Sequence, residues 1–195
     1  MKYITLLLFL VSSLTAEDWR LRKDADGVRI YTRKTSESPV EQFRGTVHLS
    51  ASVESVVSLI EDMESAPQWI HYCRLGKTLA KTPQGTYTYT ITKLPWPMND
   101  RDVVVLNKKS QDKSGIVTID FTAAPEYIPN KENMVRISKL KGSWRLSPEK
   151  GGMVGVEYTV LSDPGGGISP WMTNMGIVDQ PFKTLQNMKN MLNKQ

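Results

Sequence analysis

The C-terminal segment constrains the fold most, because a run of three glycines precedes a long amphipathic pattern. Glycine has no side chain to restrict the backbone, so residues 165–167 predict a flexible hinge. Ser169 can then cap a helix, and Pro170 suits its first position. Apolar residues recur at spacings of three and four as far as Asn193 and form one stripe: Trp171, Met175, Val178, Phe182, Leu185, Met188 and Leu192. A stripe of this length must lie on an apolar surface of the same domain.

Two features of this helix bear on its role. Pro181 lies inside the pattern, where proline removes a backbone donor and crowds the preceding turn, so we expect a bend near Ile177. The helix also carries methionines, whose flexible thioether side chains tolerate ligands of variable shape: Met172, Met175, Met188 and Met191. The pattern alone leaves two roles open, a helix that closes the core and a lid over a ligand cavity.

The N-terminal segment has the order of a secretory signal peptide. Lys2 precedes an apolar run over residues 4–11, and small residues end the segment, which predicts cleavage before Glu17. The apolar run is too short to span a bilayer. We therefore expect a signal peptide over residues 1–16 and one mature domain over residues 17–195, exported to the periplasm or secreted into the medium. The alternative is an uncleaved N-terminal anchor.

Composition limits the mature domain and its partners. A chain of 195 residues with 39% hydrophobic and 23% charged residues can bury one sizeable core. Cys73 is the only cysteine, so packing rather than an internal disulfide must stabilise the exported domain. The formal charge of +5 is spread along the chain, which favours weak attraction to lipid head groups over nucleic-acid binding. We expect a monomer that makes transient contact with a membrane surface.

The rest of the mature chain has the pattern of strands, interrupted by one helix. Alternating polarity predicts strands over residues 19–25, 28–33, 40–49, 75–81, 86–92, 102–108, 116–122, 134–146 and 153–161. Ser52 can cap a helix after the third strand, and Pro67 would end it after about three turns. This order indicates an α+β fold in which a helix packs against a strongly curved antiparallel sheet.

The predicted strands have one apolar and one polar face. Over residues 86–92, Tyr87, Tyr89 and Ile91 share one face, and threonines occupy the other. A curved sheet around a single long helix can either fill its concave side with side chains or leave a cavity.

The sequence offers little support for catalysis. Its two histidines, His48 and His71, and its single cysteine show no spacing typical of a zinc or iron site, so no metal and no cofactor are expected. A Gly-x-Ser-x-Gly elbow, a phosphate-binding loop and a dinucleotide fingerprint are also missing from the sequence. A pair of carboxylates for acid–base chemistry can be assembled from several residues, and the spacing selects none of them: Asp100, Asp102, Asp120 and Glu157. We expect a protein that is not an enzyme.

Four parts of the mature chain stand in a distinctive order. They are residues 94–102 (Leu-Pro-Trp-Pro-Met-Asn-Asp-Arg-Asp), residues 142–146 (Gly-Ser-Trp-Arg-Leu), Tyr158, and residues 163–171 (Asp-Pro-Gly-Gly-Gly-Ile-Ser-Pro-Trp). Together they resemble the START family of StAR-related lipid-transfer domains. Trp19, residues 26–28 and Trp69 are similar in order and spacing, so the resemblance covers about all of the mature chain.

The resemblance implies a helix-grip fold, in which a curved antiparallel β-sheet wraps around the long C-terminal α-helix and encloses an internal apolar tunnel. It also implies that the loop with Trp96 and the hinged helix from Pro170 form the tunnel mouth. Ligand contacts in the tunnel and at its mouth are then expected from Trp69, Tyr89, Trp96, Arg101, Tyr158, Trp171, Met172, Met175, Val178 and Phe182. Arg101 and Asp102 match the family's arginine–aspartate pair, whose simplest role is an ion pair that fixes the loop.

These observations favour a non-catalytic carrier or sensor, which holds a lipid or another hydrophobic ligand in the tunnel and exchanges it when the C-terminal helix moves. The main alternative is an enzyme of the helix-grip superfamily, a cyclase or hydrolase for a small aromatic or polyketide-like substrate. Its acid or base would be Asp120, Glu157 or His71. A third alternative is a protein-interaction module with a filled core. The carrier and the enzyme require a cavity, whereas the interaction module does not.

Overall fold

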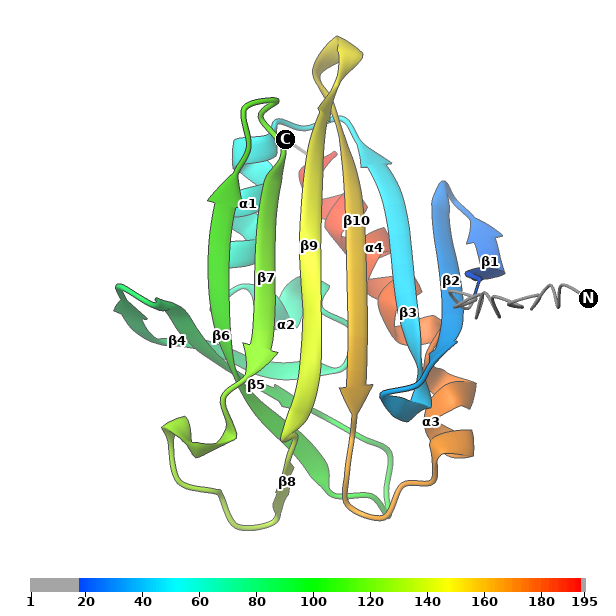
Figure 1. Cartoon of the computed structure of the whole chain (residues 1–195), viewed down its shortest axis with the longest axis vertical. Coiled ribbons are helices and arrows are strands. Elements are labelled where there is room, and N and C mark those ends of the chain that lie inside the picture. The colour runs from blue at the N-terminus through cyan, green and yellow to red at the C-terminus, as the bar shows by residue number, and fades with distance from the viewer. Residues whose placement is uncertain (1–17, 194–195) are drawn as a thin grey trace, which may run out of the picture.

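A computed structural model describes residues 18–193 of the protein, so the predicted signal peptide lies outside the described residues (Figure 1). Within this range ten strands form one sheet, in the order β1-β2-β3-β10-β9-β7-β6-β5-β4, with β8 beside β6. The strands are β1 (Arg20–Ala25), β2 (Val28–Thr35), β3 (Ser38–Leu49), β4 (Cys73–Thr82), β5 (Gly85–Thr92), β6 (Asp100–Gln111), β7 (Val117–Ala123), β8 (Met134–Arg136), β9 (Lys139–Glu149) and β10 (Met153–Asp163). Two short 3-10 helices, Pro125–Tyr127 and Lys150–Gly152, lie in the connections.

Figure 1 shows the helices α1 (Val53–Glu61), α2 (Ala66–Trp69) and α4 (Asp179–Leu192) behind the sheet, and α3 (Pro170–Gly176) near its lower end. All strand pairs are antiparallel except β6 with β8. The curved sheet wraps around α4, so the predicted α+β helix-grip fold is confirmed. Among the described residues, no helix is both long enough and apolar enough to cross a membrane.

The main core lies on the concave face of the sheet, which the helices cover. Successive side chains of a strand point to opposite faces, so every second residue of each strand reaches this core. Val156 of β10 lies opposite Val47 of β3 and Leu146 of β9, and all three are almost fully buried. Other fully buried members are Val28, Ile30, Leu49, Val56, Val154, Leu185 and Met188. A ligand site inside the protein must therefore lie on this concave face.

Helix α1 begins as predicted but ends earlier. The Ser52 hydroxyl accepts a hydrogen bond from the Ser55 N–H (3.1 Å), which satisfies a free donor of the first turn. The helix ends at Glu61, well before Pro67. Pro67 lies instead in the first turn of α2, where its missing N–H breaks no hydrogen bond because the first donors of a helix have no partner within it. The prediction that Pro67 ends the helix is wrong for this reason.

The strand predicted over residues 134–146 is two strands. β8 runs parallel to β6, whereas β9 pairs with β7 and β10. Just after β8, the Ile137 N–H donates to the Asp102 carbonyl (2.8 Å), and Arg136 forms a buried ion pair with the Asp102 carboxylate. These contacts hold the chain beside β6 and separate β8 from β9, so the prediction of one continuous strand is wrong.

The predicted bend in the C-terminal helix is confirmed, and it is a complete break. α3 ends at Gly176 and α4 begins at Asp179. Pro181 lies in the first turn of α4, so its missing N–H and its bulky ring fall at the break rather than inside a helix. The Ser169 hydroxyl accepts a hydrogen bond from the Met172 N–H (3.3 Å), as expected for the cap of α3.

Helix α4 is held on two sides. Its apolar stripe packs into the concave face, where its Leu185 is fully buried. On an adjacent side, the buried Thr184 hydroxyl accepts a hydrogen bond from the His71 N–H (3.1 Å). The Asn187 side-chain amide donates to the Trp69 carbonyl (3.2 Å). The C-terminal segment therefore has a firmly held part, α4, and a more exposed part, α3.

Gly76 of β4 provides a test of the packing between the helices and the sheet. A Cβ atom at Gly76 would overlap the Met63 carbonyl oxygen and lie 2.8 Å from Ala66 Cβ, so the backbone between α1 and α2 would have to move. We expect Gly76→Ala to lower the free energy of unfolding by about 1–3 kcal/mol, as overpacking does. Gly176→Ala is the control, because no atom lies within 4 Å of its Cβ position, and it should be neutral or stabilising. Equal free energies in urea denaturation would contradict this packing.

Candidate functional site

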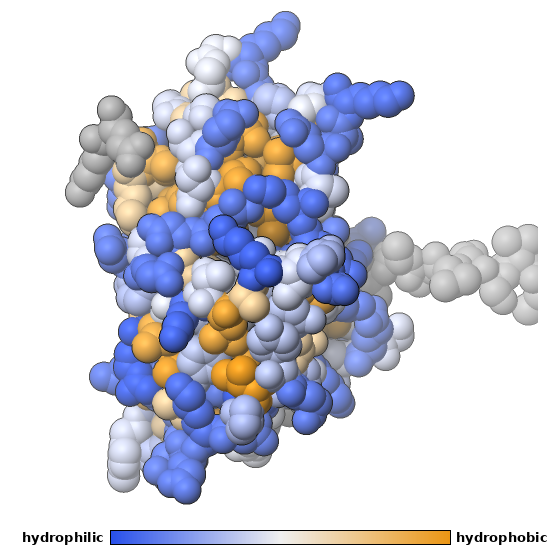
Figure 2. Space-filling view, turned by 90° about the vertical axis from the view of Figure 1, so that its left-hand side faces the viewer, coloured by the Kyte–Doolittle hydropathy of each residue, from blue (hydrophilic) through white to orange (hydrophobic). Residues whose placement is uncertain are grey.

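A hollow of about 310 Å³ opens on the concave side of the sheet, between α1, the β4–β5 hairpin and the inner faces of β6 and β7. Figure 2 views the molecule from this side and shows, in its upper half, apolar surface set back between hydrophilic side chains. Apolar side chains of Ile60, Met63 and Ile119 line the hollow, together with the polar Thr88 and Asn107. Its volume is close to the lower limit of small-molecule pockets, about 300 Å³.

A hydrogen-bonded polar pair faces this hollow from two neighbouring strands. The Asn107 side-chain amide of β6 donates to the Thr88 hydroxyl of β5 (3.0 Å) and to the Thr86 carbonyl (3.0 Å). At the rim, Lys109 forms an ion pair with Glu61 of α1 (2.6 Å). This pair is not evident from the sequence, because the alternation of β5 predicts its threonine face to be the polar face. The pair is part of a lining that also contains Lys81, Thr82 and Thr86, and it offers a point at which a ligand hydroxyl or carbonyl can hydrogen-bond.

Aromatic side chains form the middle of the concave face. Tyr158 of β10 stacks on Trp144 of β9, with ring centroids 3.7 Å apart and planes within 6° of each other. Tyr158 also meets Phe43 edge to face at 5.2 Å, and Trp144 meets Trp69 in the same way at 5.9 Å. Burial raises the pKa of Tyr158 above its usual value. Part of Tyr158 nevertheless stays accessible, and its hydroxyl has no hydrogen-bond partner among residues 18–193, so this aromatic wall is not completely covered.

Three further residues expected at the tunnel lie in the packed core or at its border. Trp69 is buried between α2 and the sheet, and its indole N–H lacks a partner within the described part of the chain. Phe182 is buried beneath the Lys23 ammonium group, which lies 3.9 Å from the ring centroid. Val178 is half-buried at the start of α4. These side chains position α2 and α4 beside the concave face.

Tyr89 points to the other side of the sheet. It follows Thr88, and neighbouring residues of a strand face opposite sides. Its hydroxyl donates to Asp102 Oδ2 (3.0 Å), and burial together with this hydrogen bond raises the pKa of Tyr89 to about 12. The segment between β7 and β8 covers the ring, with Ile128 and Met134 packed against the same cluster. The structure therefore places Tyr89 outside the concave hollow.

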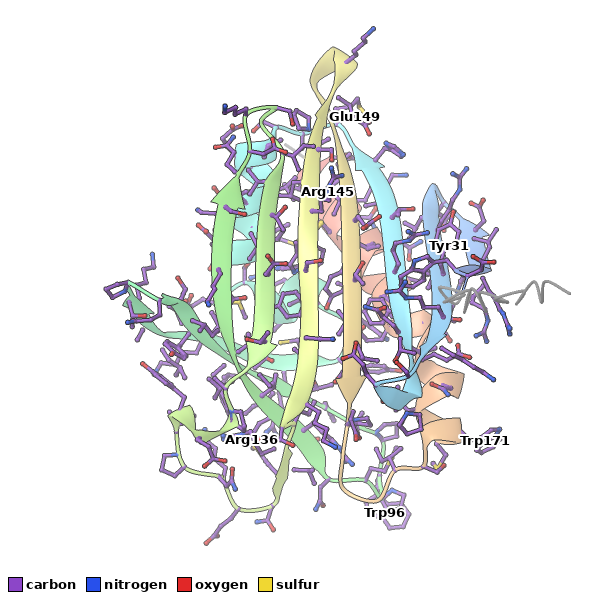
Figure 3. All side chains as sticks on the ribbon, viewed as in Figure 1. Tyr31, Trp96, Arg136, Arg145, Glu149 and Trp171 are labelled. Carbon is purple, nitrogen blue, oxygen red and sulfur yellow. The ribbon has the colours of Figure 1, made fainter. Side chains whose placement is uncertain are left out.

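The remaining predicted contacts lie near the lower end of the molecule (Figure 3). Trp96, in the β5–β6 loop, is 92% exposed, and Trp171, in α3, is 69% exposed. Both rings lie at the edge of the protein and point away from it. Met172 is exposed beside Trp171, and the side chain of Met175 lies outside the described part of the structure. Two large rings and a thioether thus project into solvent at one end of the protein.

Arg101 and Asp102 face opposite sides of β6 and do not pair with each other. The Arg101 guanidinium donates to the Asn99 carbonyl (2.6 Å) in its own loop. It also donates to the carbonyls of Pro164 (3.2 Å) and Gly165 (3.0 Å). Arg101 thereby ties the β5–β6 loop to the β10–α3 loop.

Asp102 pairs with Arg136 of β8. Arg136 donates to both carboxylate oxygens of Asp102 (3.0 and 2.9 Å), and both side chains are almost fully buried. The expected ion pair between Arg101 and Asp102 is therefore wrong, because adjacent strand residues point apart. The role of Arg136 is not evident from the sequence, because the pair joins residues 34 positions apart and depends on the parallel placement of β8.

The candidate acids and bases lie away from the concave hollow. Asp120 is exposed on the convex face of β7, and Glu157 lies on the convex face of β10, 4.0 Å from Arg44. Burial lowers the pKa of His71, and its Nε2 has no partner among the described residues. Within residues 18–193, no group of three side chains is arranged to hold a metal ion. Neither carboxylate can reach a ligand in the hollow.

Comparisons with known sequences agree with this geometry. The family model of the START domain matches residues 7–195. The uncharacterized protein PA1579 of Pseudomonas aeruginosa is 36% identical over 179 residues, which cover 92% of this chain and 89% of that protein. The phosphatidylcholine transfer protein of Mus musculus is 25% identical over 171 residues, which cover 83% of this chain and 78% of that protein.

Solved structures show the same fold. A STAR-related lipid transfer protein from Xanthomonas axonopodis superposes with a TM-score of 0.84 at 34% identity, over 90% of this chain and 98% of that chain. Human StAR-related lipid transfer protein 5 superposes with a TM-score of 0.81 at 16% identity, over 92% of this chain and 88% of that chain. These matches confirm the resemblance that the four sequence segments indicate. The chain belongs to the START domain family.

Proposed function

We propose that the protein binds a lipid or another hydrophobic ligand on the concave face of its sheet, and transfers or senses it without chemical change. Membership of the START family, whose members generally bind or transfer lipids, supports this proposal, as does the similarity to a phosphatidylcholine transfer protein. The observation that carries it is the accessible aromatic wall at Tyr158 on the same face as the hollow of about 310 Å³. Apolar ligand surface that leaves water there contributes about 25 cal/mol per Å².

The size of the hollow favours a ligand smaller than a two-tailed phospholipid. A volume of about 310 Å³ lies at the lower end of ligand pockets, which span roughly 300–1,000 Å³. One acyl chain or a fused-ring molecule suits this volume, whereas a phospholipid requires α1 and the β4–β5 hairpin to move apart. The Thr88–Asn107 pair can bind a hydroxyl or carbonyl group of the ligand. Ligand selection is proposed to depend on this pair.

Exchange of a ligand that lies along the aromatic wall is proposed to depend on α3 rather than on α4. α3 packs on β3, the strand that carries Phe43, and lines none of the hollow between α1 and the β4–β5 hairpin. The buried Leu185 and Thr184 hold α4 in the core. In contrast, α3 lies between the glycine loop, residues 165–167, and the break after Gly176. A hydrogen bond from the Glu41 N–H to Asn174 Oδ1 (2.9 Å) joins α3 to β3. A short exposed segment between two joints opens at a lower free-energy cost than a helix buried in the core.

Contact with a membrane surface is proposed for the lower end of the molecule. Aromatic rings with a polar atom favour the boundary between water and lipid, and Trp96 and Trp171 are both exposed there. Without Lys2 of the predicted signal peptide, the formal charge of +5 falls to +4, and this positive charge attracts the mature domain to anionic head groups. We propose a monomer whose contact with the membrane is transient, because a loop tip and one short helix bury little surface.

Export is part of the proposal and rests on the N-terminal sequence. Lys2, the apolar run over residues 4–11 and the small residues before Glu17 have the order that signal peptidases cleave. The mature domain would then act in the periplasm or in the medium.

The first prediction from this proposed function tests ligand binding and export in one measurement. Native mass spectrometry of the protein recovered from the periplasm or medium should show a chain that begins at Glu17 with one non-covalently bound apolar molecule.

Asn107→Leu should lower affinity for a hydroxyl-bearing ligand by about 2- to 10-fold, the effect of one hydrogen bond. Thr118→Val, on the convex face, is the control. Protein without ligand would contradict the carrier function, and a chain that begins at Met1 would contradict export.

A second prediction concerns Trp96. Trp96→Ala should slow ligand exchange with lipid vesicles several-fold, because the loop loses its interfacial ring. The free energy of unfolding should change by less than about 0.5 kcal/mol, since the side chain is almost fully exposed. Leu21→Ala, an exposed apolar residue of β1, is the control for nonspecific loss of apolar surface. A large loss of stability in Trp96→Ala would show that the ring is part of the core.

A third prediction tests the movement of α3. Glu41→Cys and Asn174→Cys, in a protein that also carries Cys73→Ser, introduce cysteines where β3 and α3 are already in contact. The oxidised protein should retain its ligand and exchange it at least about tenfold more slowly, because α3 can no longer leave the sheet. Reduction should restore the rate and serves as the control. An unchanged exchange rate with a verified disulfide would exclude α3 as the gate.

A further inference from the structure

A second hollow opens at the lower end of the molecule, between the β5–β6 loop and the β10–α3 loop. Its volume is about 270 Å³. The residues that determine its chemistry are Met98, Arg101, Gly166, Gly167 and Met172. Figure 3 shows this end of the protein, with Trp96 and Trp171 on the segments that border the hollow. It shares no lining residue with the larger hollow, so it is a separate site.

Arg101 brings a buried positive charge to this hollow. Its side chain is only 3% exposed. Three of the five guanidinium N–H groups donate to the carbonyls of Asn99, Pro164 and Gly165, at 2.6 to 3.2 Å. The other two have no partner among residues 18–193. Carbonyl groups orient the guanidinium but do not neutralise its charge.

No carboxylate pairs with Arg101 within the described residues. Its acidic neighbours in β6 are engaged elsewhere, Asp100 with Arg74 (3.3 Å) and Asp102 with Arg136 (2.9 Å). Burial lowers the pKa of Arg101, and no nearby acid counteracts this effect. Because an unpaired buried charge is unfavourable, an anion that enters the hollow would be stabilised beside it.

The glycine loop adds backbone donors to the same hollow. Gly165, Gly166 and Gly167 all have left-handed φ angles, 59°, 62° and 76°. A Cβ atom at Gly166 would lie 2.8 Å from Arg101 Nη2, so glycine is needed for the guanidinium to approach the loop. Asp163 accepts the Gly165 N–H, whereas the N–H groups of Gly166 and Gly167 donate no hydrogen bond within the described part of the chain. Successive free N–H groups in a turn can bind an anion.

We infer that this hollow binds a phosphate group, held by the Arg101 guanidinium and the N–H groups of Gly166 and Gly167. A guanidinium binds two phosphate oxygens at once, and backbone N–H groups can bind a third. The inference rests on the proposed membrane contact, which makes the phosphate the head group of a membrane lipid. Its acyl chains would then lie beside Trp96 and Trp171, the two exposed rings.

Gly167 allows a matched test of charge in this hollow. No atom lies within 4 Å of its Cβ position, so a small side chain has room there. Aspartate and asparagine have nearly the same shape and both tolerate a left-handed φ. Gly167→Asp introduces a negative charge into the proposed phosphate site, whereas Gly167→Asn introduces a neutral amide. Arg101 is unchanged in both variants, so the two loops remain tied together.

The first measurement is an NMR titration of the mature protein with sn-glycerol 3-phosphate, observed at Arg101 Nε–H and at the Gly166 amide. We expect saturable shifts in the unchanged protein and in Gly167→Asn. Binding to Gly167→Asp should be at least about tenfold weaker, as expected when charge-assisted hydrogen bonds are lost. Flotation with mixed phosphatidylcholine and phosphatidylglycerol vesicles is the second measurement. A parallel loss in Gly167→Asp would support a lipid head group, whereas equal vesicle binding by both variants would overturn that assignment in favour of a free phosphate.

Equal affinity of Gly167→Asp and Gly167→Asn for sn-glycerol 3-phosphate would overturn the phosphate site. If both substitutions prevent folding, Met98→Glu and Met98→Gln repeat the comparison from the opposite loop. The ligand extracted from the concave hollow should be the same in all these variants. Failure of the phosphate site can therefore be distinguished from failure of the proposed carrier function, in which no variant would contain a ligand.

Discussion

The close approach of α4 to β3 is the contact on which the rest of the structure depends. A Cβ atom at Gly45 would lie 2.6 Å from Leu185 Cδ1, so the helix is about as near to the sheet as a glycine permits. The sheet bends around this contact, and α1 and α2 cover its other half. On the same face Tyr158 stays partly accessible, and the Thr88–Asn107 pair faces the hollow beside α1.

The break between α3 and α4 gives the C-terminal segment two parts, which can meet two structural requirements that one continuous helix cannot meet. A helix that closes a core must stay buried, since exposure of Leu185 and Met188 would uncover a large apolar surface. A segment that admits a ligand must instead become exposed repeatedly. The chain meets the first requirement with α4. It leaves α3, on the other side of the joint at residues 177–178, with Trp171 and Met172 exposed. The long amphipathic pattern in the sequence therefore corresponds to two parts with different stability.

Local patterns in the sequence predicted most of the fold. The alternation of the strands, the Ser52 cap and the break near Ile177 depend on neighbouring residues, and all three are confirmed except for the strand over residues 134–146, which is two strands. Contacts between distant residues could not be predicted in this way, because they depend on which strands pair and in which register. The ion pair of Asp102 and Arg136 requires the parallel strand β8, and the Thr88–Asn107 pair requires the register of β5 with β6. Adjacency in sequence was misleading for Arg101 and Asp102, since neighbours on a strand point to opposite faces.

The hydrogen bonds of Arg101 also determine how the two loops at the lower end can move. One guanidinium is bonded to Asn99 on the β5–β6 loop and to Pro164 and Gly165 on the β10–α3 loop. A displacement of the β5–β6 loop must either carry the β10–α3 loop with it or break hydrogen bonds to a charged group, each of which contributes about 1.5–3 kcal/mol. A force that acts on the exposed ring of Trp96 is thus transmitted to the segment that leads into α3. The two loops are mechanically coupled, and the coupling resides in a single side chain.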